Sequence, residues 1–263
     1  MKNYISLVCA VCLLPSLVSA QDEPVKTRIK KVKFGASLSF SYNKPIFKGV
    51  DSTTGYSLVP RINLGPVHKD KNGVANAYKG PLKFELRPRF GFFNQGYEAD
   101  DSIQLSGMND RDSSFNLGLK LRSRTPVGTF IVSGGYDVTG KSDGFEGSLM
   151  YTTLLPLTSS KLRLYPEIGV KYWSSKTSDY YFGVNSDETA DSTGSTVRDT
   201  YDITDSTTNY FIGYSAAYPL TKRWGLTHSL QKTWYDDQIL NSPVVDDDKA
   251  SDLSVTFGVT YDF

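Results

Sequence analysis

The feature that most constrains the fold of this chain is a period-two alternation of apolar and polar residues. The clearest example is the C-terminal segment 253–263, where Leu253 and every second residue up to Phe263 are aliphatic or aromatic, and the residues between are small or polar. Successive side chains of a β-strand point to opposite faces. The segment is therefore predicted to be a strand with one apolar and one polar face.

Nine earlier segments repeat this pattern, and most of the ten are roughly 9 to 12 residues long. Strands of soluble sheets average about five or six residues, whereas a tilted membrane-spanning strand needs about 9 to 11. Strand length therefore favours a transmembrane barrel over a secreted β-sandwich. The gaps between the predicted strands are 43–54, 65–81, 93–113, 122–127, 139–143, 157–160, 173–207, 219–222 and 234–250.

Gap length gives an independent indication of the same fold. If the first strand starts in the periplasm, four of the five outside gaps are long and three of the four periplasmic gaps are tight. Outer-membrane barrels show this asymmetry. We predict an all-β, antiparallel, transmembrane up-and-down β-barrel of about ten strands. The gap 65–81 breaks the rule, and an extra hairpin there would give twelve strands.

The N-terminus has the pattern of a secretory signal peptide. Lys2 precedes an apolar run over 5–17, and small residues over 18–20 predict cleavage after Ala20. Because this run is shorter than a spanning helix needs, an N-terminal anchor is disfavoured. The predicted organisation is a signal peptide over 1–20, a periplasmic tail over 21–31 and an outer-membrane barrel over 32–263.

Composition excludes several classes of protein. Both cysteines, Cys9 and Cys12, lie in the predicted signal peptide, so the mature chain would have no disulfide, thiolate metal site or cysteine nucleophile. The 29 basic and 28 acidic residues nearly cancel, which argues against a nucleic-acid partner. No later run reaches the 18 or so apolar residues of a spanning helix. No cofactor is indicated.

The second half of the chain contains three distinctive sequence blocks. The blocks are a "YYFGV" motif, an "LT..W.L" strand start and an "SP.V" motif before the last strand. Their residues are Tyr180, Tyr181, Phe182, Gly183, Val184, Trp224, Ser242 and Pro243. Together these blocks resemble the MipA/OmpV family of outer-membrane proteins, and the resemblance implies a non-enzymatic protein of the Gram-negative outer membrane. The name-giving member is described as a scaffold that binds a lytic murein transglycosylase and a penicillin-binding protein, which links the family to peptidoglycan remodelling.

Aromatic residues gather at the ends of the predicted strands, as in the interfacial girdles of barrels. The final Phe263, with Tyr261 two residues before it, resembles the signal read by the barrel-assembly machinery. We therefore expect contacts with outer-membrane lipid, with lipopolysaccharide and with that machinery.

The polar faces of the predicted strands are rich in bases, with nine bases against four acids. In a barrel of about ten strands, side chains nearly fill the lumen. Two interpretations remain open: a salt-bridge network that plugs the barrel, or a narrow pore that prefers anions. The bases are Lys33, Arg61, Lys83, Arg87, Arg89, Lys120, Arg122, Arg163 and Lys171, and the acids are Glu85, Asp137, Glu146 and Glu167.

Candidates for chemistry are few. His68 is expected in a solvated turn, and His228 on the apolar face of a strand. The acidic loop 185–207, which contains Glu188 and one base, Arg198, is expected to be solvated. With Asp246–Asp248, it suggests a divalent-ion bridge to lipopolysaccharide phosphates, although its spacing does not match a calcium loop.

Three functions follow from the sequence, in decreasing order of support. The first is a scaffold or interaction protein, the second is a narrow anion-preferring channel for small solutes, and the third is a barrel hydrolase that would use His228.

Overall fold

The computed structural model describes residues 4–6, 33–63, 82–155, 157, 161–191, 194 and 196–263. Within these ranges, eleven strands form one sheet with the spatial order β1-β3-β2-β11-β10-β9-β8-β7-β6-β5-β4. The strands are β1 (Tyr4–Ser6), β2 (Lys33–Lys44), β3 (Thr53–Asn63), β4 (Lys83–Phe93), β5 (Ser114–Thr125), β6 (Gly128–Asp137), β7 (Phe145–Thr152), β8 (Arg163–Trp173), β9 (Thr207–Pro219), β10 (Trp224–Trp234) and β11 (Ser251–Asp262).

Ten long strands pair with their sheet neighbours in antiparallel fashion, and the N-terminal strand β2 pairs with the C-terminal strand β11. The ten predicted strands are therefore confirmed. Most of their ends agree within two residues, except that β5 runs on to Thr125 and β7 stops at Thr152. The short β1 pairs in parallel with Gly55–Ser57 of β3. The segment that would hold a further hairpin, 64–81, lies outside the described residues, as does the predicted cleavage point at Ala20.

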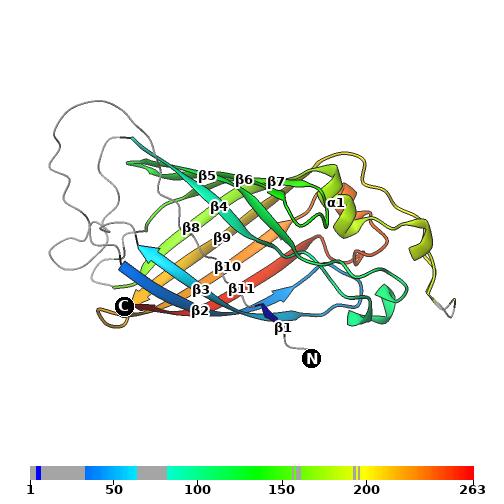
Figure 1. Ribbon diagram of the computed structural model, residues 1–263, viewed down its shortest axis with the longest axis horizontal. Helices are drawn as coiled ribbons and strands as arrows, with labels where there is room; N and C mark the ends of the chain where they lie inside the picture. The colour runs from blue at the N-terminus through cyan, green and yellow to red at the C-terminus, as the bar shows by residue number, and fades with distance from the viewer. Residues whose placement is uncertain are drawn as a thin grey trace.

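The sheet curls, so that it has an inner and an outer face (Figure 1). On the inner face Arg89 of β4 reaches Glu146 of β7, two strands beyond its neighbour, at 2.5 Å. Likewise Lys171 of β8 donates a hydrogen bond to Gln231 of β10. These contacts between strands that are not adjacent require a concave inner face, which surrounds the lumen.

The outer face is apolar over its whole width. Leu86 is 64% exposed and Ile168 is 55% exposed, and both lie in mid-strand. Water would make such a continuous apolar surface unfavourable, whereas lipid chains solvate it. The alternation found in the sequence thus separates a lipid-facing surface from a polar lumen. Among the described helices, none combines the length and apolar composition that crossing a bilayer would require.

The connections differ at the two ends of the sheet (Figure 1). At one end 126–127 and 220–223 are short turns, and we call it the turn end. Thr221 stabilises the second turn by accepting hydrogen bonds from the N–H groups of Arg223 and Trp224. At the other end lie the connections 45–52, 94–113, 138–144, 174–206 and 235–250, which we call the loop cap. By the usual orientation of such barrels, the turn end faces the periplasm.

Adjacent residues of β11 test the assignment of the two faces. Val255 points outward and Thr256 inward, as their register with Leu230 and Ser229 requires. Val255→Arg is expected to lower the free energy of unfolding in lipid by about 2–4 kcal/mol, since it places a charge among acyl chains. Thr256→Arg should cost much less. Urea titration of the barrel refolded in vesicles measures both, and equal losses would contradict the assigned faces.

Candidate functional sites in the loop cap and the lumen

The loop cap contains the main hydrophobic core of the described chain. Four of its five connections contribute side chains to this core, together with strand ends such as Trp173. The core residues are Ile46, Phe47, Val50, Phe93, Tyr97, Leu105, Met108, Trp173, Tyr181, Phe182, Val184, Ile203, Tyr235, Ile239, Val244 and Val245. Packed loops, rather than open ones, therefore cover this end of the barrel.

Phe182 lies at the centre of the cap core. It is the last residue of α1 (Ser175–Phe182), and its ring stacks on that of Phe47 at a centroid distance of 5.3 Å and on that of Trp173 at 6.2 Å. Its carbonyl accepts a hydrogen bond from the hydroxyl of Ser242. Two of the blocks that carry the family resemblance, 180–184 and 241–245, thus meet in one core.

The other motif residues have distinct places. Gly183 ends α1, and its N–H donates to the carbonyl of Asp179. Tyr180 is half-buried and accepts a hydrogen bond from the N–H of Asp112. Pro243 is also partly buried. Trp224 lies at the turn end instead, 4.6 Å from the ring of Tyr261, which in turn contacts Phe263 at 5.3 Å.

A buried ion pair holds two cap loops together. Arg111 donates to the Glu188 carboxylate at 2.8 Å, and the side chains of both residues are almost completely buried. That carboxylate also accepts hydrogen bonds from the N–H groups of Asn109 and Asn185. Burial alone would raise the pKa of Glu188, but these hydrogen bonds lower it to about 2.

The prediction that Glu188 lies in a solvated acidic loop is wrong. Its partner Arg111 is 77 positions away, so no local pattern reveals the pair. Arg198 is buried as well, and its guanidinium donates to the carbonyls of Glu188, Gln104 and Ser106. Asp246 pairs with Lys249 at 3.3 Å. The divalent-ion bridge to lipopolysaccharide stays a prediction.

The lumen differs between its two halves. In the half next to the loop cap, which we call the cap half, Arg89 and Lys171 each have a side-chain partner: Glu146 binds Arg89 and accepts from the amide of Asn116, and Lys171 donates hydrogen bonds to the neutral Gln231 and Thr233.

In the half next to the turn end, which we call the turn half, five cations of β4 and β5 share the inner face with one acid of those strands, Glu85. The Glu85 carboxylate binds Arg87 and lies 3.9 Å from the guanidinium of Arg124. The five cations are Lys83, Arg87, Lys120, Arg122 and Arg124.

Six of the nine bases predicted for the lumen, on β4, β5 and β8, take inward register positions. Arg163 is a seventh, on β8 opposite Ala217. The side chains of Lys33 and Arg61 lie outside the described residues. Arg124 was missed, because the predicted strand ended before it, although the alternation continues through the sequence K-L-R-S-R.

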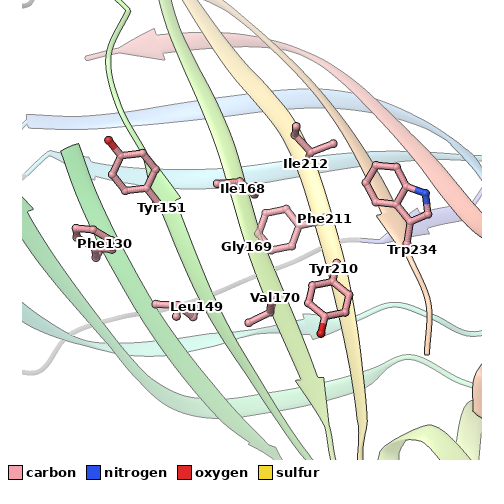
Figure 2. Close-up of a pocket in the computed structure, with 10 residues that line it drawn as sticks. All are labelled: Phe130, Leu149, Tyr151, Ile168, Gly169, Val170, Tyr210, Phe211, Ile212 and Trp234. Carbon is pink, nitrogen blue, oxygen red and sulfur yellow. The ribbon is translucent and has the colours of Figure 1, made fainter. Parts of the chain in front are cut away.

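The outer face has shallow apolar hollows. One of them lies over β6 to β10, between side chains such as Leu149, Ile168 and Ile212 (Figure 2), and its volume is about 420 Å³. Phe211 points inward and packs against Gly169, where a Cβ atom would lie 2.6 Å from the ring. In the assigned topology this surface faces lipid, so acyl chains fill the hollow.

His228 lies in a second outer hollow, of about 530 Å³. Its ring packs between those of Tyr214 and Phe257, at centroid distances of 5.4 and 4.5 Å. The predicted place of His228 on the apolar face is confirmed. An Asp-His pair that activates water would have to lie in an aqueous site, and the outer face is not one. His68 lies outside the described residues.

The architecture alone defines the class of protein to which this chain belongs. One curled antiparallel sheet of long strands, with an apolar outer face, a polar lumen, short turns and long loops, is that of an outer-membrane β-barrel protein. The model of the family described as "MltA-interacting protein MipA" matches residues 14–263. The chain belongs to this family and is an outer-membrane protein.

Curated relatives include three named outer-membrane or interaction proteins. The chain is 28% identical to outer membrane protein OmpV of Vibrio cholerae, over 88% of this chain and 79% of the relative. It is 28% identical to outer membrane protein Omp26La of Vibrio anguillarum, over 64% and 61%. It is 29% identical to the MltA-interacting protein of Escherichia coli, over 64% of each. The match thus spans less than two thirds of two of these relatives.

Solved structures with a related shape include two outer-membrane proteins. The N-terminal β-barrel domain of Pseudomonas aeruginosa OprF matches with a TM-score of 0.31 at 14% identity, covering 69% of this chain and 96% of that one. Neisserial surface protein A matches with a TM-score of 0.29 at 8% identity, covering 88% and 97%. The strand order of this chain, and not these distant likenesses, defines its fold.

The buried ion pair makes a testable contribution to the cap. Arg111→Met leaves the Glu188 carboxylate buried without its cation, which is expected to lower the free energy of cap opening by about 3–5 kcal/mol. Hydrogen exchange at the N–H groups of Asn109 and Asn185 measures this loss. Lys141→Met, which breaks the exposed Lys141–Asp112 pair, is the matched control and should leave the exchange unchanged.

The same pair predicts a pH dependence. Because folding lowers the pKa of Glu188 from about 4.5 to about 2, its contribution is complete above about pH 4.5 and is lost as the pH falls towards 2. Hydrogen exchange between pH 7 and 5 should therefore show constant cap stability. Loss of protection within that range would contradict the assigned pair.

Proposed function

We propose that this chain is a non-enzymatic outer-membrane scaffold that holds peptidoglycan-remodelling enzymes near the membrane. The observation that carries this proposal is the packed cap core, in which residues such as Phe182, Trp173 and Ile239 are at most 1% exposed. A barrel whose outer mouth is covered by such a core is suited to presenting surfaces. The name of the relative, MltA-interacting protein, supports a lytic murein transglycosylase as one partner.

The turn end is the surface on which we place the partner. It faces the periplasm in the assigned topology, where the cell wall lies. Its described turns, 126–127 and 220–223, are short, and Val127 at the tip of the first is 70% exposed. A penicillin-binding protein is a second candidate partner at the same end, by the family resemblance. The aromatic pair Tyr261 and Phe263, at the same end, is our candidate for the signal to the barrel-assembly machinery.

The scaffold proposal predicts that the two ends differ in binding. The refolded barrel, fixed to a support, is expected to retain a lytic murein transglycosylase from periplasmic extract. Val127→Asp puts a charge on the turn end and should lower the affinity about tenfold, the effect of losing roughly 1.4 kcal/mol. Ile103→Asp makes the same change at an 81% exposed position of the cap and serves as control.

Biolayer interferometry with the purified transglycosylase gives both affinities. Capture that Ile103→Asp weakens and Val127→Asp leaves intact would place the partner at the cap. Failure to retain any cell-wall enzyme would refute the scaffold.

A narrow anion-preferring channel is the second candidate, and the excess of bases in the lumen favours it. The cap core opposes it, because ions would have to pass through packed aromatic side chains. We expect no steady current from the wild-type barrel in planar bilayers. Phe182→Ala removes the central ring of the core, at a cost of about 3–5 kcal/mol to the cap, and is expected to produce anion-selective current. Steady wild-type current would favour the channel over the scaffold.

A further inference from the structure

The turn half of the lumen departs from the way proteins usually arrange charge. In the register of β4 with β5, Lys83 lies directly opposite Arg124, and Arg87 lies directly opposite Lys120. Like charges directly across an antiparallel pair destabilise a sheet. We call two residues that lie opposite each other on neighbouring strands a rung. Of the three rungs here, only the middle one, Glu85 opposite Arg122, combines opposite charges.

The rest of this half does not neutralise the cluster. Lys120 interacts electrostatically with Arg87, Arg89 and Arg122 on its own side, and with Glu167 across the lumen. Glu167 in turn accepts a hydrogen bond from Ser215. The other described acid here is Asp262, at the end of β11. The facing strands place small hydroxyl residues at inward positions, and Arg163 of β8 adds a further base. The hydroxyl residues are Ser37, Ser39, Ser57, Thr227, Ser229 and Thr256.

We propose that the turn half of the lumen is a binding site for a multivalent phosphate-type anion, which enters at the turn end and is held there. The cations lie on the inner faces of three successive rungs. Adjacent rungs are about 7 Å apart, since each strand residue rises about 3.4 Å. That spacing suits an anion with two linked charged groups, such as a diphosphate.

The chemistry of the side chains matches this ligand. Arginine guanidinium groups bind phosphate through two parallel hydrogen bonds, and lysine adds a point charge. The hydroxyl side chains opposite can donate further hydrogen bonds. Because the cap core covers the far end of the barrel, the proposed site is closed toward the cap and is not part of a conducting path. The inference is independent of the scaffold proposal, which concerns the exposed turns at the turn end and not the lumen.

The test is calorimetric titration of the folded full-length barrel with pyrophosphate, with sulfate at equal ionic strength as reference. Pyrophosphate is expected to bind at least tenfold more tightly than sulfate. Lys120→Gln and Arg122→Gln should each weaken pyrophosphate binding about tenfold or more, because each removes a charge-assisted hydrogen bond. Lys176→Gln, an exposed charge in α1, is the control and should bind as the wild type does.

A second readout separates a ligand site from a structural network. With no anion bound, the double variant Lys120→Gln/Arg122→Gln should melt at the same temperature as the wild type or higher, because repulsion is relieved. A lower melting temperature together with unchanged pyrophosphate affinity would assign the cluster a structural role and overturn the proposal. Equal binding of pyrophosphate and sulfate would overturn it as well.

Competition by short-chain phosphatidic acid identifies the source of the phosphate. If dihexanoyl phosphatidic acid displaces pyrophosphate, the site accepts a lipid headgroup. If it does not, and pyrophosphate binds as expected, the ligand is a free anion. Because no transglycosylase takes part, failure here leaves the capture experiment unaffected, and failure of capture leaves this proposal unaffected.

Discussion

The backbone hydrogen bonds that lipid cannot provide are the constraint on which the rest of this structure depends. In the hydrocarbon region each N–H and C=O must find its partner on a neighbouring strand, which forces long strands into one continuous ladder. Two of the strand prolines fit the same constraint. Pro60 in β3 and Pro88 in β4 lie on the two long strands at the ends of the described order, where a missing N–H removes no bond to a second long strand. Once the ladder exists, the outer face must be apolar and the inner face is free to carry charge.

The loop cap shows how the protein orders long connections outside the membrane. Long loops would lose conformational entropy on ordering without compensation, unless they bury apolar area of their own. Here four connections bring rings such as Phe47, Tyr181 and Phe182 into one core, and the Arg111–Glu188 pair ties two of them together. The cap is thus a small folded unit built on the barrel rim. Its packed side chains cover the lumen at this end of the barrel.

The barrel could be predicted well from the sequence, because the alternation that identifies each strand lies within a short segment. Alternation over ten residues identifies a strand and its two faces, so strand positions, the place of His228 and the basic inner face all followed from short segments. The end of β5 and the inward position of Arg124 were missed, because the outward residue Ser123 is not apolar although the bases keep the period of two. The cap could not be predicted in this way, since Phe182 meets Ser242 and Asn109 meets Glu188 across 60 and 79 positions. The motif blocks marked the right residues, but only the fold shows that they form one core.

The two halves of the lumen accommodate charged side chains in different ways. In the cap half Arg89 and Glu146 form a pair completed by Asn116, as expected of a network that fills and rigidifies a barrel. In the turn half the same strands place Arg87 opposite Lys120 and Lys83 opposite Arg124. If the whole inner face were a structural plug, acids would be expected in both halves, because forming an ion pair costs no more free energy at one end of the lumen than at the other. A recess lined by one sign of charge and bounded by low-dielectric walls raises the local concentration of counter-ions. The uneven pairing therefore supports a structural role for the half beneath the cap and the proposed recognition role for the half at the turn end.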